Sequence, residues 1–283
     1  MVTLGSDGCA ILSTVSLIVE AEVVENIQLA NPNFLLAVRA PEIAANVRPG
    51  QFVMAAVADD LSIPHPLLKR ALAIFSVESE AGLPSIITLL VKVVGDGTQR
   101  LASLLPDEHV NLIGPLGNGF SSTGTSDRVH LLAAGGVGIA SFYLLAEDLR
   151  RSGQEVHLLY GARTAQDLVG LEYFERLRIP LLLTTEDGSA GVQGLITEGL
   201  EQCLAQFVDR TPTLYVCGPD PMMKAVSALA SLHRIPCQIS VESKMACGFG
   251  VCLGCTIETV DSYQLACSDG PVFDAEKFIW KEG

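Results

Sequence analysis

The stretch Arg128–Gly153, RVHLLAAGGVGIASFYLLAEDLRRSG, decides the fold class. It starts with an apolar run typical of a buried strand, passes through a glycine-rich turn, and continues with apolar residues at helical spacing that stop at a glycine. Further compact apolar runs follow, with helical patterns between or after them: EVHLLYGAR (155–163), IPLLLTTED (179–187) and TPTLYVCGPD (211–220). Strands that alternate with helices predict a Rossmann-like parallel α/β domain, which we expect over residues 128–234.

The pattern differs on both sides of this region. Residues 1–122 contain short runs rich in Val, Ile and Leu, such as NFLLAVRA (33–40), separated by turn residues. These runs predict an antiparallel β-barrel or sandwich domain, and the small polar stretch Ser121–Asp127 predicts a linker. Residues 235–283 form a short module rich in cysteine and glycine. The expected order is therefore a β domain, an α/β domain and a small C-terminal module.

Composition and charge exclude several classes of function. Hydrophobic residues make up 49% of the 283 residues and charged residues 18%, which is ample for packed cores. The 32 Asp and Glu against 18 Lys and Arg give a net charge of −14, which repels nucleic acids and anionic membranes. No apolar run approaches the roughly 20 residues that cross a bilayer, and no secretory signal pattern is apparent. We expect a cytoplasmic protein with neither a nucleic-acid nor a membrane partner.

The C-terminal module concentrates three cysteines and three glycines in ACGFGVCLGC (246–255). The spacing is Cys247-x4-Cys252-x2-Cys255, and Cys267 follows farther on. This is the arrangement of plant-type [2Fe–2S] ferredoxins, in which three thiolates on one loop and a distant fourth hold the cluster. The glycines allow positive φ and bring backbone N–H groups close to sulfur. The spacing therefore predicts a [2Fe–2S] site.

Two other interpretations of the module stay open. Cys252 and Cys255 have the spacing of half a zinc ribbon, although a ribbon normally supplies a second close pair and the other two cysteines stand singly. Free thiols are the other alternative, although clustered thiols in a reducing compartment point to a metal or a catalytic role. We expect the scattered cysteines to be small buried hydrophobic residues: Cys9, Cys203, Cys217 and Cys237.

A cluster that moves single electrons needs a converter to work with a two-electron carrier, and flavin is the usual one. The β region offers weak candidates for such a site. HPLLKRALAIFSV (65–77) carries Arg70, which could neutralise a pyrophosphate. Gly95-Asp96-Gly97-Thr98 opens an apparent helix, where free N–H groups favour phosphate, and GPLGNGF (114–120) is another glycine-rich turn.

The α/β region offers candidates for a nicotinamide site. Its first glycine turn, within Ala133–Leu145, would let a pyrophosphate approach the start of a helix. Three later motifs strengthen this interpretation: YGARTAQDL (160–168), TTEDGSAGVQGLIT (184–197) and YVCGPDPMM (215–223). Taken alone, Cys217 could be a buried thiol at the end of a strand, but inside the last motif we favour a place at the cofactor.

In this order, the motifs resemble the ferredoxin–NADP reductase superfamily. The ending ESKMACGFGVCLGC…LACSDGPVF resembles that of the electron-transfer subunits of class B dihydroorotate dehydrogenase, and the likeness spans nearly the whole chain. The resemblance implies an FAD-binding antiparallel β-barrel, an NAD-binding domain and a [2Fe–2S] module. It also implies a separate FMN-containing catalytic subunit that oxidises dihydroorotate, in a heterotetramer of two copies of each chain. Electrons would pass from that subunit through the cluster and FAD to NAD⁺.

The same resemblance assigns residues to each group. FAD would be held by residues of the barrel: Arg70, Ala71, Leu72, Ala73, Leu90, Val91, Lys92, Gly97 and Thr98. NAD would lie against Gly135, Gly136, Gly138, Gly218 and Pro219, with Cys217 as the catalytic position. The iron ligands would be Cys247, Cys252, Cys255 and Cys267.

Two departures from the family pattern affect these assignments. Ala73 stands where the flavin strand usually has Ser, so it offers no hydroxyl to the flavin, and Ser141 stands where the glycine loop usually has Pro. The choice between NAD and NADP stays open, because Arg163 could meet a 2′-phosphate; the resemblance favours NAD. The alternative function is an FAD/[2Fe–2S] subunit of another NAD(P)H reductase, of the ferredoxin transhydrogenase or hydrogenase type, although Cys247 favours the first interpretation.

Overall fold

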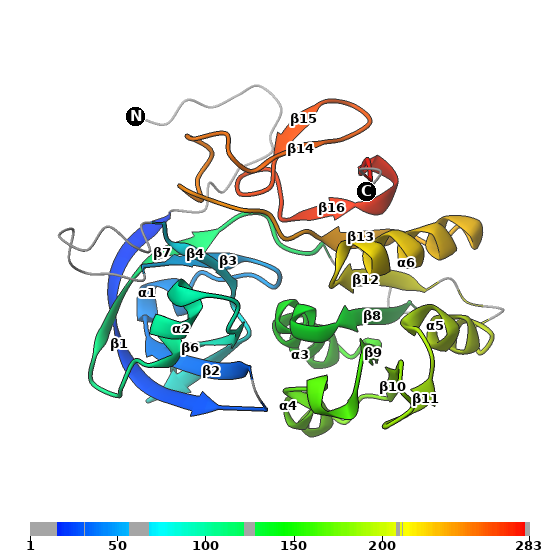
Figure 1. Cartoon of the computed structure of the whole chain (residues 1–283), viewed down its shortest axis with the longest axis horizontal. Helices are drawn as coiled ribbons and strands as arrows, with labels where there is room; N and C mark the ends of the chain where they lie inside the picture. The colour runs from blue at the N-terminus through cyan, green and yellow to red at the C-terminus, as the bar shows by residue number, and fades with distance from the viewer. Residues whose placement is uncertain are drawn as a thin grey trace.

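A computed structural model of the chain describes residues 16–30, 32–56, 68–121, 128–207, 210 and 212–280. Cys9 and residues 122–127 of the expected linker lie outside the described residues. The chain folds into an antiparallel sheet, a mostly parallel sheet with helices, and a small C-terminal module that lies along both (Figure 1). This order of parts agrees with the order expected from the sequence.

The N-terminal part is a curled antiparallel sheet of seven strands, in the order β4-β3-β7-β1-β2-β6-β5. The strands are β1 Leu17–Gln28, β2 Asn33–Arg39, β3 Phe52–Ala55, β4 Arg70–Ala73, β5 Ser76–Glu80, β6 Leu83–Lys92 and β7 His109–Leu116. The short helices α1 Pro41–Ala44 and α2 Asp96–Ala102 accompany them. Alternate residues of β1, such as Ala21 and Val23, are fully buried in the barrel core. The predicted antiparallel barrel is confirmed.

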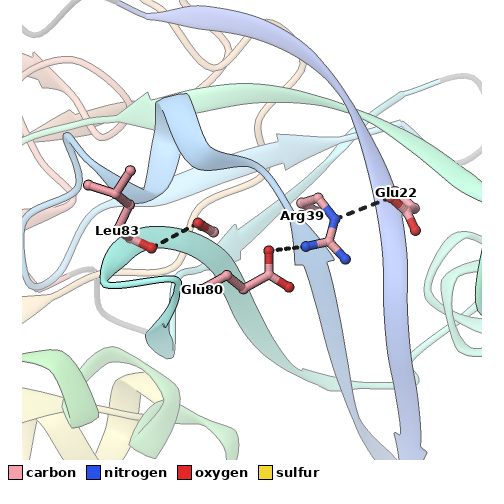
Figure 2. A network of polar contacts seen from close by, with 5 residues as sticks. Glu22, Arg39, Glu80 and Leu83 are labelled. Carbon is pink, nitrogen blue, oxygen red and sulfur yellow. Dashed lines mark hydrogen bonds and ion pairs between the residues drawn. The ribbon is translucent and has the colours of Figure 1, made fainter.

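An ion-pair network on the barrel surface ties three strands together (Figure 2). The Arg39 Nε on β2 donates to Glu22 Oε2 on β1 at 3.2 Å, and its Nη1 donates to Glu80 at the end of β5. Arg39 and Glu22 are direct partners in the register of β1 and β2. All three side chains are partly exposed, so water and salt screen the attraction, and the network orients strands more than it stabilises the fold.

The second sheet also has seven strands, in the order β11-β10-β9-β8-β12-β13-β16. They are β8 Val129–Gly135, β9 Glu155–Ala162, β10 Leu181–Thr185, β11 Val192–Gln193, β12 Thr213–Cys217, β13 Cys237–Ser240 and β16 Val272–Asp274. All neighbours are parallel except β13 and β16. Every residue of β8 is buried, as expected for a parallel strand covered on both faces. The predicted Rossmann-like α/β arrangement is confirmed.

Short helices connect these strands: η1 Gly136–Ser141, α3 Tyr143–Arg151, η2 Ala165–Asp167, α4 Leu171–Arg176, α5 Ile196–Leu204 and α6 Asp220–Leu232. The segment that follows β8 was expected to be helical, and it begins with the 3₁₀ turn η1 before α3 starts. In the part of the chain that the structure describes, no helix has the length and apolar character needed to cross a membrane.

The C-terminal module consists of the cysteine loop, the hairpin β14 Thr256–Glu258 and β15 Tyr263–Leu265, the strand β16 and the 3₁₀ turn η3 Ala275–Lys277. Strand β16 returns to the α/β sheet and pairs with β13. The sheet therefore extends past residue 234, where the sequence pattern placed its end. Cys203, Cys217 and Cys237 are buried, as predicted for scattered thiols.

Candidate functional site

The cysteine loop directs backbone N–H groups at its sulfur atoms. The Gly250 N–H donates to Cys267 Sγ at 3.1 Å, and the Cys252 N–H donates to Cys247 Sγ at 3.5 Å. Gly250 has φ +85°, a conformation that side chains disfavour, so glycine at this position lets its amide turn toward sulfur. Such N–H···S hydrogen bonds stabilise thiolates and tune metal clusters.

The thiols of the loop interact in two pairs. Burial raises the pKa of Cys247, but hydrogen bonds from the N–H groups of Cys252, Phe249 and Val251 and from the Cys252 thiol outweigh it, so its pKa falls to about 6. Burial, the neighbouring Cys255 thiol and the charge of Cys247 raise the pKa of Cys267 to about 12, despite the Gly250 N–H. The backbone agrees with these pairs: the Cys252 N–H donates to Cys247 Sγ, and the N–H of Ala266, which precedes Cys267, donates to the Cys255 carbonyl at 3.1 Å.

This pairing bears on which metal the module fits. Among the described residues, no three or more His, Cys, Asp or Glu side chains are placed to hold one metal ion together. A structural zinc ion needs four ligands around a single centre. A [2Fe–2S] cluster instead spreads four cysteine ligands over two irons. Four thiols in two neighbouring pairs, with backbone N–H groups directed at Cys247 and Cys267, are the donor set that a two-iron cluster requires.

The cysteine loop packs tightly against the barrel. A side chain at Gly248 would come within 2.3 Å of Met54 Cγ on β3 and 3.2 Å of Leu116 Cδ1 on β7, so only glycine fits there. Met54 and Leu116 share one hydrophobic core with Cys255 and Cys267. The loop is thereby fixed to the part of the molecule in which the sequence predicts the flavin.

Two of the predicted flavin residues meet directly. The Arg70 guanidinium, on edge strand β4, lies against the backbone of Gly97 at the start of α2; a Cβ at Gly97 would be 2.5 Å from Arg70 Nε. The Thr98 hydroxyl accepts a hydrogen bond from the Val94 N–H at 2.9 Å and donates to the Gly95 carbonyl at 3.0 Å. This cradle combines a cation with a fixed turn, which suits a pyrophosphate.

The other predicted flavin residues are spread over β4 and β6. Ala71, Leu72 and Ala73 are half-buried on β4. Leu90 and Val91 direct their side chains into hydrophobic cores, so only their backbone can reach a ligand. Lys92, the last residue of β6, lines a pocket on the α/β side of the barrel.

That pocket has a volume of about 480 Å³ and lies at the carboxyl ends of β8, β9, β10 and β12, where open α/β sheets bind ligands. Gly135, Gly136 and Pro219, for which the sequence predicts contact with NAD, line it. Gly138 and Gly218 lie behind the lining and allow backbones to touch. A Cβ at Gly138 would be 2.4 Å from the Cys217 carbonyl oxygen, and one at Gly218 would be 3.0 Å from Gly135 Cα.

Cys217 lies at the end of β12 with 2% of its surface exposed. Burial raises its pKa to about 12, so the thiol is neutral at physiological pH. Ser141, which stands in place of the usual proline, has its hydroxyl oxygen 3.4 Å from Cys217 Sγ. The geometry therefore gives Cys217 the character of a neutral packing and hydrogen-bonding group, not of a thiolate nucleophile.

Comparison with known proteins agrees with this arrangement. The family described as "Iron-sulfur cluster binding domain of dihydroorotate dehydrogenase B" matches residues 242–279, and "Oxidoreductase NAD-binding domain" matches residues 132–228. A dihydroorotate dehydrogenase B (NAD(+)) electron transfer subunit homolog of Aquifex aeolicus is 36% identical, over 92% of this chain and 97% of its own length. The chain belongs to this electron transfer subunit family.

Another member of the electron transfer subunit family, from Desulforamulus reducens, is 32% identical and covers 94% of this chain and all of its own length. A solved NADH-dependent reduced ferredoxin-NADP oxidoreductase has a TM-score of 0.79 and 28% identity, covering 92% of this chain and 90% of that chain. These matches extend over both sheets and the cysteine module, and they confirm the family resemblance predicted from the sequence.

The sequence did not predict several residues that line the pocket at the carboxyl ends of β8, β9, β10 and β12. Asn33 reaches it from β2, where it is the direct strand partner of Lys92. Glu186 and Asp167 line it beside Arg163. Glu186 stood inside a motif that the sequence singled out, but only the order of β9 and β10 in the sheet brings it to the same wall as Arg163.

Proposed function

We propose that this chain carries electrons between an FMN-containing subunit that oxidises dihydroorotate and NAD⁺, through a [2Fe–2S] cluster and FAD. The observation that carries the proposal is the cysteine loop, with backbone N–H groups directed at its sulfur atoms, packed on the barrel beside Met54 and Leu116. A nicotinamide-type pocket opens on the other side of the same barrel at Lys92. Both ends of an electron path thus adjoin one domain.

For the cluster, we assign Cys247 and Cys252 to one iron and Cys255 and Cys267 to the other. The Cys252 N–H donates to Cys247 Sγ, and the Ala266 N–H donates to the Cys255 carbonyl, and both hydrogen bonds support this division. The N–H groups of Gly250 and Cys252 already point at Cys267 and Cys247, and they would offset the negative charge of the thiolates. A [2Fe–2S] cluster transfers single electrons and a flavin handles one or two, so together they would join a one-electron route to a hydride carrier.

For FAD, we assign Arg70 to the pyrophosphate, with the backbone at Gly97 and Thr98 completing the cradle. The close contact between Arg70 and Gly97 supports this role, because a larger residue at 97 would displace the guanidinium. Ala73 supplies no hydroxyl to the flavin ring, so the remaining residues of β4 would contribute backbone groups.

For the nicotinamide nucleotide, we assign the pocket at the ends of β8, β9, β10 and β12. The glycines at 135 and 136 leave the backbone accessible to a diphosphate. Asp167 and Glu186 lie on the wall that carries Arg163, and carboxylates there would repel a 2′-phosphate while accepting a hydrogen bond from a free ribose hydroxyl. We therefore assign NAD rather than NADP.

The overall reaction balances with NAD⁺ as the acceptor. Oxidation of dihydroorotate to orotate releases two electrons and two protons. NAD⁺ takes both electrons and one proton, and the other proton passes to solvent. We place the carbon chemistry on the partner subunit and the nicotinamide chemistry in the pocket of this chain.

For the partner subunit, we assign the exposed apolar surface of the cysteine module. Phe249, Val251 and Leu253 on the cysteine loop and Tyr263 on β15 are between 49% and 73% exposed. Exposed apolar side chains on one small module are candidates for the core of a protein interface. A partner seated there would lie directly over the cluster, so electrons would cross a short gap.

Substitution of this surface tests the docking site. We expect Val251→Glu to weaken binding of the FMN subunit about tenfold or more, because it places a charge in an apolar interface. Leu232→Glu is the matched control, since Leu232 is 74% exposed at the end of α6 and not on the module. Calorimetric titration of the two chains measures the effect. Equal binding by both variants would exclude this surface.

A second candidate function follows from one comparison. The matched NADH-dependent reduced ferredoxin-NADP oxidoreductase shares 28% identity and the whole layout. In that case the partner would be a second flavoprotein and the electron donor a ferredoxin. The higher identity to the Aquifex aeolicus relative, 36%, favours the dihydroorotate function.

The decisive experiment is a coupled assay on the complex. The chain is purified anaerobically with its FMN partner, its iron and FAD contents are measured, and NAD⁺ reduction driven by dihydroorotate is followed. The proposal expects steady NADH formation that requires both subunits. A fully loaded complex that forms no NADH from dihydroorotate but exchanges electrons with ferredoxin would support the second candidate instead.

A further inference from the structure

The glycine-rich turn Gly114–Phe120, GPLGNGF, joins parts of the molecule that lie far apart in sequence. On the barrel side, the buried Gln51 donates from Nε2 to the Gly117 carbonyl at 2.7 Å. On the α/β side, Gln238 of β13 makes hydrogen bonds of 2.8–3.0 Å with the next residue, Ser121. The turn is thus held at both ends by different sheets.

Between these ends, Asn118 binds the C-terminal module. Its side-chain Nδ2 donates to the Ser268 carbonyl at 2.9 Å and to the Asp269 carbonyl at 3.0 Å, and its backbone N–H donates to the Gly270 carbonyl at 2.6 Å. Asn118 and Pro271 also form an isolated β-bridge. One barrel residue therefore contacts the backbone of the segment that directly follows Cys267.

The segment that Asn118 holds is a closed turn with Cys267 inside it. The N–H groups of Ser268, Asp269 and Gly270 all donate to the Leu265 carbonyl, and Asp269 Oδ2 accepts from the Leu265 N–H at 2.7 Å. A turn braced in this way moves as one body, so whatever fixes residues 268–270 also fixes Cys267. The Gly250 N–H, which donates to Cys267 Sγ, depends on the same placement.

We propose that Asn118 is a positioning residue that sets the place of Cys267, and hence of the second cysteine pair, relative to the flavin-binding barrel. This inference rests on the proposed function, because it concerns how the cluster and FAD are held relative to each other. Residues around metal ligands commonly change metal retention and activity when they are substituted. Electron transfer also falls steeply with distance, so loss of the Asn118 bonds would slow exchange between the two groups.

The Cys247 side of the loop does not depend on Asn118. It is held by the contact of Gly248 with Met54 and Leu116, which involves other strands and no hydrogen bond from Asn118. A change at Asn118 should therefore affect the Cys255–Cys267 pair and leave the Cys247–Cys252 pair in place. An effect on one cysteine pair alone would indicate positioning by Asn118, whereas a general loss of stability would affect both pairs.

The test uses Asn118→Asp, which keeps the shape but replaces the donating amide with a carboxylate that faces two carbonyl oxygens. Asn26→Asp is the matched control, because Asn26 Nδ2 also donates to two backbone carbonyls, of Leu101 and Leu104, at 3.0 and 2.9 Å within the barrel. Both variants lose the same kind of hydrogen bonds. Of these two asparagines, Asn118 is the one that contacts the cysteine module.

Four quantities are compared in the reconstituted chains: the rate at which a chelator removes iron, the EPR spectrum of the reduced cluster, the rate of cluster reduction by NADH, and the rate of ferricyanide reduction by the flavin. For Asn118→Asp we expect iron loss about tenfold faster and cluster reduction about tenfold slower than in the wild type. Its EPR line shape should change, while its direct reduction of ferricyanide from the flavin should not. Asn26→Asp should match the wild type in all of these.

The outcomes are separable. If Asn118→Asp behaves as wild type, or if both variants lose iron and flavin together, Asn118 does not position the cluster. If the wild-type chain itself binds no iron or flavin, the proposed function fails before the variants are compared.

Discussion

Cys247 in the C-terminal module and Cys217 in the α/β domain carry the same side chain in opposite environments. Cys247 receives hydrogen bonds from several backbone N–H groups, which lower its pKa to about 6 despite partial burial. Cys217 is buried beside the Ser141 hydroxyl, and burial raises its pKa to about 12. The difference teaches that the backbone N–H groups and the burial around a cysteine set how readily its thiol ionises.

The largest contrast should appear in alkylation of the metal-free chain near neutral pH. Thiolate is the reactive form, so at pH 7 a thiol of pKa about 6 is mostly ionised, whereas one of pKa about 12 is ionised in roughly one molecule in 10⁵. After iron removal, iodoacetamide should modify Cys247 and leave Cys217 untouched, as mass spectrometry can measure. Reactivity of Cys247 should fall as the pH drops through 6, because its thiolate is then protonated. Equal labelling of the two cysteines would break the comparison.

Substitution in the module should separate it from the flavin site. We expect Cys252→Ser to bind almost no cluster but to keep its FAD, because Arg70 and Gly97 lie on β4 and α2 of the barrel and the four cysteines lie in the C-terminal module. Cys203→Ala is the control, since Cys203 is buried on α5 among apolar residues. Iron and flavin are counted in each purified variant. Loss of both groups from Cys252→Ser would contradict the separation of the two sites.

A smaller effect is expected from a substitution in the nicotinamide pocket. There the charge of the side chains, and not thiol chemistry, should determine the preference for NAD⁺ over NADP⁺. Replacing Glu186 with Gln removes one partly screened carboxylate from the wall beside Arg163. The kcat/KM for NADP⁺ relative to NAD⁺ should rise roughly fivefold, equivalent to about 1 kcal/mol. Glu175→Gln, on the exposed face of α4, is the control. An unchanged ratio would mean that Glu186 does not take part in the choice of nucleotide.

Much of the fold followed from local patterns. The parallel strands were recognisable because both faces of each are covered, which leaves continuous apolar runs such as the fully buried β8. The cysteine set was recognisable because three of its four members lie between residues 247 and 255, at a spacing typical of [2Fe–2S] sites. The junction of β13 with the module was missed: β13 has only four residues and is soon followed by the cysteine loop.

The site residues that the sequence patterns did not indicate depend on contacts between distant parts of the chain. Asn118 and Ser268 are 150 residues apart, so nothing in GPLGNGF indicates that the turn binds the segment after Cys267. Glu186 and Lys92 reach the same pocket only through the packing of the two sheets. Such residues become visible only when the strand order and the side-chain positions are known.

The most direct test of the whole account is EPR spectroscopy of the isolated chain, purified anaerobically with iron and FAD bound, before and after addition of NADH. The account predicts that NADH alone produces the signal of a reduced [2Fe–2S] cluster, because the nicotinamide pocket, the flavin cradle and the cysteine loop adjoin one barrel. A chain that carries both iron and FAD but gives no such signal, or that holds zinc in the cysteine module, would contradict it.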